Sequence, residues 1–368
     1  MEQIKGMDVS TYLEVINCGG EFYDDGREAD LFDILQKYKV NSVRLRLWND
    51  PYSENGNPYG AGNCDIDCVK TIAQKAKEHN MSFLLDLHYS DFWTDPGKQI
   101  LPKAWRDYGL DKLVDAVNSY TKDVINELKK ADVTPDFVQV GNEITNGMLW
   151  PHGKIYTEGN DVPNYDNIAK LVSSGVKAVR SECDAKVMIH LDNGGNNKLY
   201  REWFDNYVKR GEDFDIIGLS YYPFWHGTFD MLENNMNDIA TRYNKDLIVA
   251  EVSMGHTMED YAHYEKLTKE ERMGMATRPE LAEKVEYPMS KEGQVDFMKR
   301  LLQIIDNVPN NHGKGYYYWE PAWIPVPGSG WATEDSLKYM DAKGPCGNEW
   351  ANQALFDYDG NVLPALKL

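Results

Sequence analysis

Residues 136–143 read DFVQVGNE, and residues 246–253 read DLIVAEVS. Each stretch is a short apolar and β-branched run that reaches a glutamate, a composition typical of a strand buried in a parallel sheet. Runs of the same kind lie at residues 6–10, 40–48, 82–90, 186–194, 215–223 and 314–321. The sequence therefore predicts eight strands, two of which lead into a carboxylate.

Helical patterns separate these strands. Apolar residues recur every three or four positions in segments 29–38, 66–79, 110–130, 165–182, 198–210, 229–243 and 291–307. Asp65, Asn164 and Ser290 stand where helix N-caps belong. Alternating strands and helices predict parallel βαβ units, and no low-complexity linker divides the chain. We therefore predict an α/β fold, a single (β/α)8 TIM barrel formed by residues 1–368.

Composition limits the partners of the chain. Its 39 Lys and Arg against 59 Asp and Glu give a net charge of −20, and such a surface repels nucleic acid and anionic lipid. No apolar run reaches the 18 residues that a membrane-spanning helix needs. The 10 Trp and 23 Tyr fit either an aromatic core or a protein that stacks rings on the apolar faces of sugars.

Several kinds of catalytic centre find no support among the motifs. The sequence has no glycine-rich phosphate loop, no GxSxG nucleophile turn and no HExxH zinc motif. The five cysteines include no CxxC pair and no Cys/His spacing typical of a zinc site. We therefore expect no cofactor and no metal.

Glu143 and Glu251 carry the chemistry that the pattern favours. The ends of strands four and seven of an eight-stranded barrel face each other across its mouth, so we expect the two carboxyls to converge there. Burying a carboxylate is costly unless the group is paired or used. Two carboxyls, one protonated and one ionised, are what glycoside hydrolysis requires. For either glutamate alone, a salt-bridged strand end is the competing interpretation.

Other polar side chains occur in phase with the barrel interior, near the ends of the remaining strands. They are Arg44 and Arg46, Asp86 and His88, His190 and Asp192, Ser220 and Tyr222, and finally Trp319. One inward His or Tyr is more often a satisfied core group. A whole ring of polar groups departs from the Val, Ile and Leu that usually fill barrel interiors, and therefore indicates a site.

Tryptophans follow several of the predicted strands, in the loops at the barrel mouth. They are Trp93, Trp150, Trp225, Trp323 and Trp331. Each is a candidate platform for a sugar ring, and each could equally anchor its loop.

Specific stretches of the chain resemble a known family. LHYSDFWTDPGKQ at residues 87–99 and VGNEITNGMLWP at residues 140–151 are the most distinctive, and GLSYYPFW, VAEVS and YYYWEPAW match as well. The chain resembles the endo-β-1,4-galactanases of glycoside hydrolase family 53 from its first strand to its eighth. The resemblance implies cleavage within β-1,4-galactan, the side chain of pectin and type I arabinogalactan, to galacto-oligosaccharides.

The resemblance also implies roles for individual residues. Glu143 would be the acid/base and Glu251 the nucleophile of a retaining mechanism, while Asn142 would bind the sugar 2-hydroxyl. A ring around the cleavage subsite is implied, formed by Arg44, His88, Tyr222 and Trp319. Arg44 and Arg46 both face inward, so which of them contacts the nucleophile is left open.

Members of this family are exported, so the resemblance implies an extracellular, periplasmic or cell-surface location, although residues 1–10 contain no apolar signal segment. We expect a monomer. Some bacterial members hold calcium in the loop after strand seven. Residues 251–267 lack the alternating ligands of that site, which predicts no calcium there, and residues 264–275 have a helix-like pattern.

Two alternatives accompany this interpretation. Another endo-glycanase of the same clan, such as a β-mannanase or a glucanase, would share the two glutamates but not the distinctive stretches at residues 87–99 and 140–151. A non-catalytic barrel that only binds glycan would not need both carboxyls.

Overall fold

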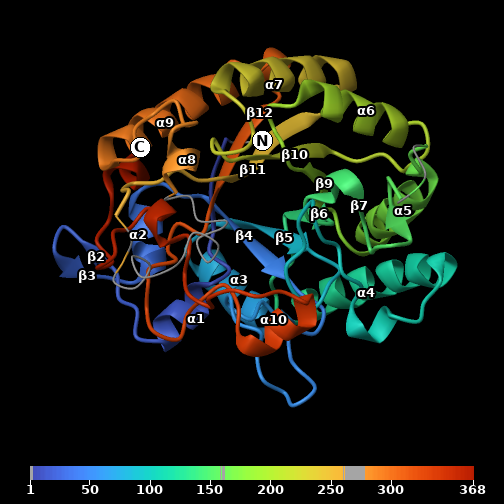
Figure 1. Cartoon of the computed structure of the whole chain (residues 1–368), viewed down its shortest axis with the longest axis horizontal. Coiled ribbons are helices and arrows are strands. Elements are labelled where there is room, and N and C mark those ends of the chain that lie inside the picture. Colours follow the sequence, from blue (N-terminus) through green and yellow to red (C-terminus); the bar gives the residue numbers. More distant parts are fainter. Residues whose placement is uncertain (1–2, 158, 160–161, 260, 262–277) are drawn as a thin grey trace.

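The computed structural model describes residues 3–157, 159, 162–259, 261 and 278–368. Its centre is a closed barrel of parallel strands, so the predicted fold is confirmed (Figure 1). Around the barrel the order is β1-β4-β5-β6-β9-β10-β11-β12, and β12 pairs with β1. These strands are β1 (Ile4–Asp8), β4 (Ser42–Leu47), β5 (Ser82–Leu87), β6 (Phe137–Val140), β9 (Lys186–Leu191), β10 (Ile216–Tyr221), β11 (Asp246–Val252) and β12 (Gly313–Trp319).

Helices surround the barrel and connect its strands. They are α1 (Tyr12–Asn17), α2 (Leu31–Lys37), α3 (Ile66–Glu78), α4 (Leu110–Lys130), α5 (Tyr165–Glu182), α6 (Asn197–Tyr207), α7 (Phe229–Tyr243), α8 (Pro279–Ala282), α9 (Lys291–Asp306) and α10 (Glu334–Met340). The side chains of Asp65, Asn164 and Ser290 accept hydrogen bonds from backbone N–H groups in the first turns of α3, α5 and α9. All three predicted N-caps are therefore confirmed.

Two short hairpins lie outside the barrel, and the sequence patterns did not predict either. They are β2 (Tyr23–Asp24) with β3 (Arg27–Glu28), and β7 (Gly147–Met148) with β8 (Gly153–Lys154). Two-residue strands are too short to produce a periodic pattern. The helix-like pattern at residues 264–275 lies outside the described residues. Among the residues that the structure describes, no helix is long and apolar enough to cross a membrane.

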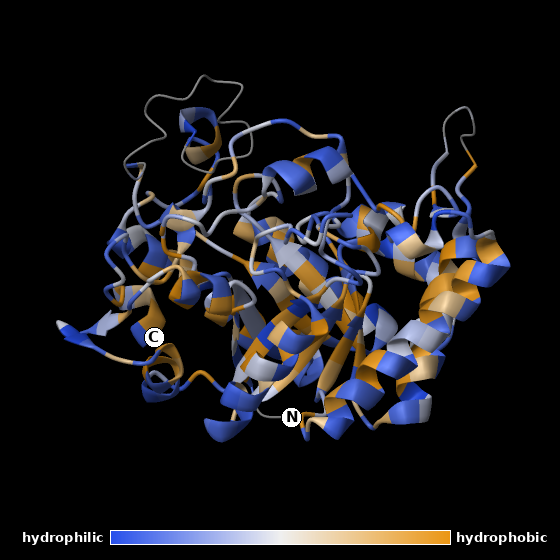
Figure 2. Cartoon of the chain, turned by 90° about the horizontal axis from the view of Figure 1, so that it is seen from below, coloured by the Kyte–Doolittle hydropathy of each residue, from blue (hydrophilic) through white to orange (hydrophobic). Residues whose placement is uncertain are grey.

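The core has an inner and an outer part. In Figure 2 the strands at the centre are mostly orange, the colour of hydrophobic residues, whereas the surrounding helices alternate between hydrophilic blue and hydrophobic orange. The inner cluster draws on seven of the eight barrel strands and comprises Ile4, Leu84, Phe137, Met188, Ile216, Ile248, Ala250 and Tyr317. Further along in the same phase, β5, β9 and β10 present Asp86, His190 and Ser220. Apolar packing therefore gives way to polar side chains towards the C-terminal ends of the strands.

Candidate active site

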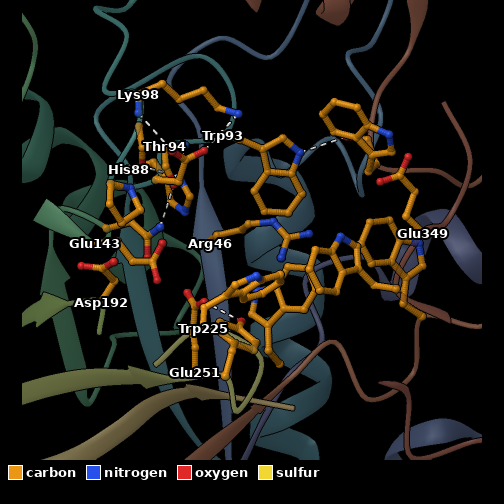
Figure 3. A pocket seen from close by; sticks show the side chains of 18 of the residues that line it. Arg46, His88, Trp93, Thr94, Lys98, Glu143, Asp192, Trp225, Glu251 and Glu349 are labelled. Atoms are coloured by element: carbon orange, nitrogen blue, oxygen red, sulfur yellow. Dashed lines mark hydrogen bonds and ion pairs between the residues drawn. The ribbon is translucent and has the colours of Figure 1, made fainter. Parts of the chain in front are cut away.

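A cavity of about 670 Å³ opens at the C-terminal ends of the barrel strands (Figure 3). Most of the side chains that the sequence singled out line it, namely Arg44, Arg46, His88, Trp93, Asn142, Glu143, Asp192, Tyr222, Trp225, Glu251, Trp319, Trp323 and Trp331. Asp86 is fully buried and holds two of these residues, Arg44 and His88, from behind. Trp150 does not line this cavity, so its role as a sugar platform finds no support in the geometry.

Glu251 enters the cavity through an irregularity in β11. Leu219 of β10 pairs with Val249, but the next residue, Ser220, pairs with Glu251, so Ala250 is an extra residue in β11. Ile248 and Ala250 belong to the barrel interior, and simple alternation would turn Glu251 outward. The bulge changes the phase of the strand and directs the carboxyl into the site, as bulges near active sites commonly do.

Two donors hold the Glu251 carboxylate. Arg44 Nη2 lies 2.9 Å from Oε1, and the Tyr222 hydroxyl donates to Oε2 at 2.8 Å. Arg44 also forms ion pairs with Asp8 and Asp86, both at 2.8 Å. The arginine that contacts the predicted nucleophile is therefore Arg44. A buried guanidinium aimed at this oxygen favours the ionised form of Glu251.

Glu143 stands in a different environment. It lies three residues beyond the end of β6, in the left-handed region at φ 46° and ψ 51°. Gly141 precedes it at φ 83°, and a Cβ there would meet Ile144 Cγ2 at 2.6 Å. This tight turn carries the buried Glu143 side chain into the cavity, where its Oε1 lies 2.6 Å from the Ser220 hydroxyl.

The two carboxyls differ in the groups that act on their pKa. Burial raises the pKa of Glu143 well above its usual range, and the carboxylates of Glu251 and Asp192 raise it further, opposed by the Ser220 hydroxyl. Burial also raises the pKa of Glu251, but Arg44 and Tyr222 oppose that rise. Since, among the residues that the structure describes, only Glu251 has a cation against it, Glu143 is the carboxyl that keeps the proton.

A hydrogen-bonded chain fits a protonated Glu143. His190 Nε2 lies 2.8 Å from Ser220 Oγ, and its Nδ1 lies 3.1 Å from Asn142 Oδ1. Burial, followed by the charge of Arg44, lowers the pKa of His190 well below its usual value, so the imidazole is neutral. Its Nδ1–H then donates to Asn142, and its Nε2 accepts from Ser220, whose oxygen is free to accept from the Glu143 carboxyl.

Asn142 is fixed by its neighbours. Its amide oxygen accepts from Arg44 Nη2 at 3.0 Å and from Gln139 Nε2 at 3.2 Å, and its amide nitrogen donates to the Thr94 carbonyl at 2.9 Å. The second amide proton has no partner among the described residues. Since Asn142 lines the cavity, that proton is placed to bind a substrate hydroxyl.

His88 is held between Asp86 and Thr94. Its Nε2 lies 3.0 Å from Asp86 Oδ2, and its Nδ1 lies 2.9 Å from the Thr94 hydroxyl. These partners assign the Nε2–H tautomer, because Asp86 can only accept while the Thr94 hydroxyl can donate. The imidazole is thereby fixed at the cavity wall.

Arg46 serves a neighbouring part of the site. It pairs with Glu320 at 2.5 Å, and Thr11 donates to the other Glu320 oxygen at 2.5 Å. Burial raises the pKa of Glu320 to about 7, with Arg46 opposing. The guanidinium carbon of Arg46 lies 4.3 Å from the centroid of the Trp93 ring, so a cation–π contact supports Trp93 at the cavity wall.

Aromatic rings surround the rest of the cavity. Trp319 is 6.1 Å from Trp93 and 6.4 Å from Tyr222, measured between ring centroids. Trp350 lies 5.8 Å from both Trp319 and Trp225, and Trp225 is 42% exposed. These rings offer the flat apolar surfaces on which sugars stack.

Outside the masked segments, no group of three or more His, Cys, Asp and Glu side chains is arranged to hold a metal ion. The prediction of no calcium after strand seven concerns residues 251–267, of which 260 and 262–267 lie outside the described residues. That prediction is therefore untested.

Several functional candidates escaped the sequence analysis. Asp8, Gln139 and Glu320 belong to the polar network, and each lies in or directly after a barrel strand. Their positions in or directly after predicted strands could have identified them as candidate site residues. Glu349 and Trp350 lie in a loop far along the chain from β12, and only the folded structure brings them to the cavity.

A family model described as glycosyl hydrolase family 53 matches residues 4–368. The chain belongs to glycosyl hydrolase family 53. An endo-β-1,4-galactanase of Bacillus subtilis (strain 168) is 35% identical to this family 53 chain over 385 residues, covering 99% of the chain and 85% of that protein.

Solved structures of the family have the same fold. The family 53 catalytic domain of Ignisphaera aggregans superimposes with a TM-score of 0.88 and 37% identity, covering 100% of this chain and 95% of that one. A fungal β-1,4-galactanase structure gives a TM-score of 0.77 and 29% identity, covering 100% and 98%. The recognition of the family from its motifs is therefore confirmed.

Proposed function

We propose that this chain is a retaining endo-β-1,4-galactanase in which Glu143 is the acid/base and Glu251 the nucleophile. One observation carries the two roles. Glu251 accepts from Arg44 and Tyr222, whereas among the described residues Ser220 supplies the one side-chain hydrogen bond to the Glu143 carboxyl. An ionised carboxylate opposite a protonated one is the arrangement that glycoside hydrolysis uses.

In the first step, Glu251 attacks the anomeric carbon while the bond from that carbon to the leaving oxygen breaks. Glu143 gives its proton to the leaving oxygen, so the departing chain leaves as a neutral alcohol. As Glu251 becomes an ester its charge disappears, and Arg44 remains balanced by Asp8 and Asp86. Asn142, fixed at its oxygen, offers its remaining amide proton to the sugar hydroxyl next to the anomeric carbon.

In the second step, Glu143 is ionised and takes a proton from water, whose oxygen attacks the anomeric carbon and releases Glu251. Ser220 can reorient its hydroxyl to donate to the ionised Glu143, because a hydroxyl both donates and accepts. Two displacements at one carbon restore the β configuration. Retention requires carboxyls about 5–5.5 Å apart.

The shape of the cavity supports attack within the polymer. Trp93, Trp225, Trp319 and Trp350 come from loops or strand ends after three different strands and lie along the cavity. Rings spread in this way can bind several sugars along a chain, and that binding energy positions the bond to be cut.

The substrate assignment rests on the relatives of the chain. The Bacillus subtilis protein and the fungal structure are named as β-1,4-galactanases. The alternatives of another endo-glycanase or a non-catalytic barrel therefore have weaker support than galactan cleavage.

Two further proposals follow from the same assignment. A polymer of pectin cannot enter a cell, so we place the enzyme outside the cytoplasm, in the extracellular, periplasmic or cell-surface space. We also propose that it works as a monomer, since one chain supplies both carboxyls of the cavity. Fractionation of the producing cells checks the first proposal, and light scattering of the purified chain checks the second.

A panel of polysaccharides tests the proposed function. The wild-type chain, Glu251→Ala and the control Glu78→Ala are incubated with β-1,4-galactan, β-mannan, β-glucan and xylan, and new reducing ends are measured. Glu78 is an exposed residue at the end of α3. We expect galactan to be cut by the wild type and by Glu78→Ala only. Mannan or glucan cut faster than galactan by the wild type would overturn the substrate assignment.

A further inference from the structure

Glu349 is an ionisable group of the cavity that the two catalytic roles leave unexplained. It lines the same cavity as Glu143 and Glu251, but Figure 3 places it at the opposite end from them. Its side chain is half-buried, and among the described residues no donor or cation forms a hydrogen bond or ion pair with it. Carboxyls removed from water are normally partnered. A partner that arrives with the substrate would explain this exception.

The segment around Glu349 is held rigidly. Trp331 Nε1 donates to the Pro345 carbonyl at 2.7 Å, and the Trp331 N–H donates to the Gly347 carbonyl at 3.1 Å. Gly330 lies so close to this segment that an added Cβ would meet the Cys346 carbonyl oxygen at 1.9 Å. The loop that carries Glu349 is therefore packed against the loop that follows β12.

The residues after Glu349 are fixed as well. Asn348 donates to the Trp323 carbonyl at 2.6 Å, and the Trp350 ring packs edge-on against Trp225 and Trp319. Glu349 directly precedes Trp350, and the backbone before it is bound by Trp331. All three residues line the same cavity, and the loop that carries Glu349 is anchored at both sides. A carboxyl presented in this way needs no rearrangement to meet a ligand.

Burial alone raises the pKa of Glu349 to about 8, and the thiol of Cys346 is a titratable group near it. At neutral pH the protonated form therefore predominates, and it has one O–H donor and an acceptor oxygen. Sugar hydroxyls likewise both donate and accept, so a neutral carboxyl in a cavity lined by aromatic rings matches a pyranose.

We propose that Glu349 is a substrate-contacting residue that hydrogen-bonds a hydroxyl of a galactosyl unit bound away from the scissile bond, at the Trp331–Trp350 end of the cavity. This inference rests on the proposed galactanase function. It assigns the far end of the cavity to the neutral sugar chain, and it makes Glu349 a determinant of affinity for the polymer.

Kinetics on β-1,4-galactan test the assignment, with Glu349→Ala, Glu349→Gln and the control Glu334→Ala. Glu334 is an exposed glutamate at the start of α10, outside the cavity lining. In Glu349→Ala we expect KM to rise about three- to ten-fold with kcat nearly unchanged, the size of one lost neutral hydrogen bond. Glutamine also donates and accepts, so Glu349→Gln should restore most of the affinity.

Melting temperatures separate a contact from a structural role. Removing an unpartnered, half-buried carboxyl should leave the Tm of Glu349→Ala at or above that of the wild type. An unchanged KM in Glu349→Ala would overturn the assignment, as would equal rises in KM for both variants with a lowered Tm. If the wild type leaves galactan uncut, the proposed function itself is overturned. That result comes from the wild type alone and does not depend on the Glu349 variants.

Discussion

Replacing Tyr222 by Phe removes one oxygen atom from the site and keeps the ring. The lost hydroxyl donates to Glu251 Oε2 at 2.8 Å. A hydrogen bond to a charged group contributes about 1.5–3 kcal/mol, and 1.36 kcal/mol corresponds to one pKa unit. Because this donor stabilises the ionised carboxylate, its loss should raise the pKa of Glu251 by about one to two units.

The pH dependence of kcat/KM on galactan measures this shift. The acidic limb follows ionisation of the nucleophile, so it should move to higher pH by about one to two units in Tyr222→Phe. The basic limb follows loss of the Glu143 proton and should move much less, which narrows the profile. The two carboxyls interact, so the limbs belong to the pair, with Glu251 dominating the acidic one.

Tyr221→Phe is the matched control for this experiment. Its hydroxyl donates to the Gly227 carbonyl at 3.0 Å and does not line the cavity. The same atom is removed from the neighbouring residue, so the pH profile should stay as in the wild type. An acidic limb that is identical in Tyr222→Phe and the wild type, in a folded variant, would refute the assignment of Tyr222 as the donor that keeps Glu251 ionised.

Three further variants probe the rest of the site. Glu143→Ala should lower galactan hydrolysis about 10²–10⁴-fold. It should spare the first step with activated aryl glycosides, whose leaving group needs no proton, and a burst of released aryl group would show this. Loss of galactan hydrolysis together with loss of the burst would contradict an acid role. When Glu143 is ionised, the Ser220 hydroxyl turns to donate to it, and this bond lowers the pKa of Glu143. Ser220→Ala removes the bond, so the basic limb should move up by about half to one unit, and a downward shift would contradict this. Trp93→Ala should raise KM for galactan about ten-fold; a lowered Tm with unchanged kinetics of the folded fraction would make Trp93 a loop anchor.

The barrel could be predicted because each strand and helix has its own periodic signal, and the caps at Asp65, Asn164 and Ser290 are local as well. Most of the polar ring could be predicted for the same reason, since alternation along a strand determines which side chains point inward. The sequence could not predict which of Arg44 and Arg46 contacts Glu251. Both point inward, and only the closed barrel decides which guanidinium reaches Glu251.

Glu251 shows the limit of periodicity. Counting from Ile248 and Ala250 would place it outside the barrel, and the extra residue in β11 is visible only in the pairing with β10. Glu349 is a second case. It reaches the cavity because its loop packs against Trp331, and no local sequence pattern predicts a contact between these two segments.

The anomeric configuration of the first product is the most direct test of the central claim that Glu143 and Glu251 cleave β-1,4-galactan by double displacement. Proton NMR follows the hydrolysis of a β-1,4-galacto-oligosaccharide by the wild-type chain from the first minutes. The account predicts that the β anomer of the new reducing end appears first and the α anomer only later, by mutarotation. Initial formation of the α anomer would show a single displacement by water and would contradict the role of Glu251 as nucleophile.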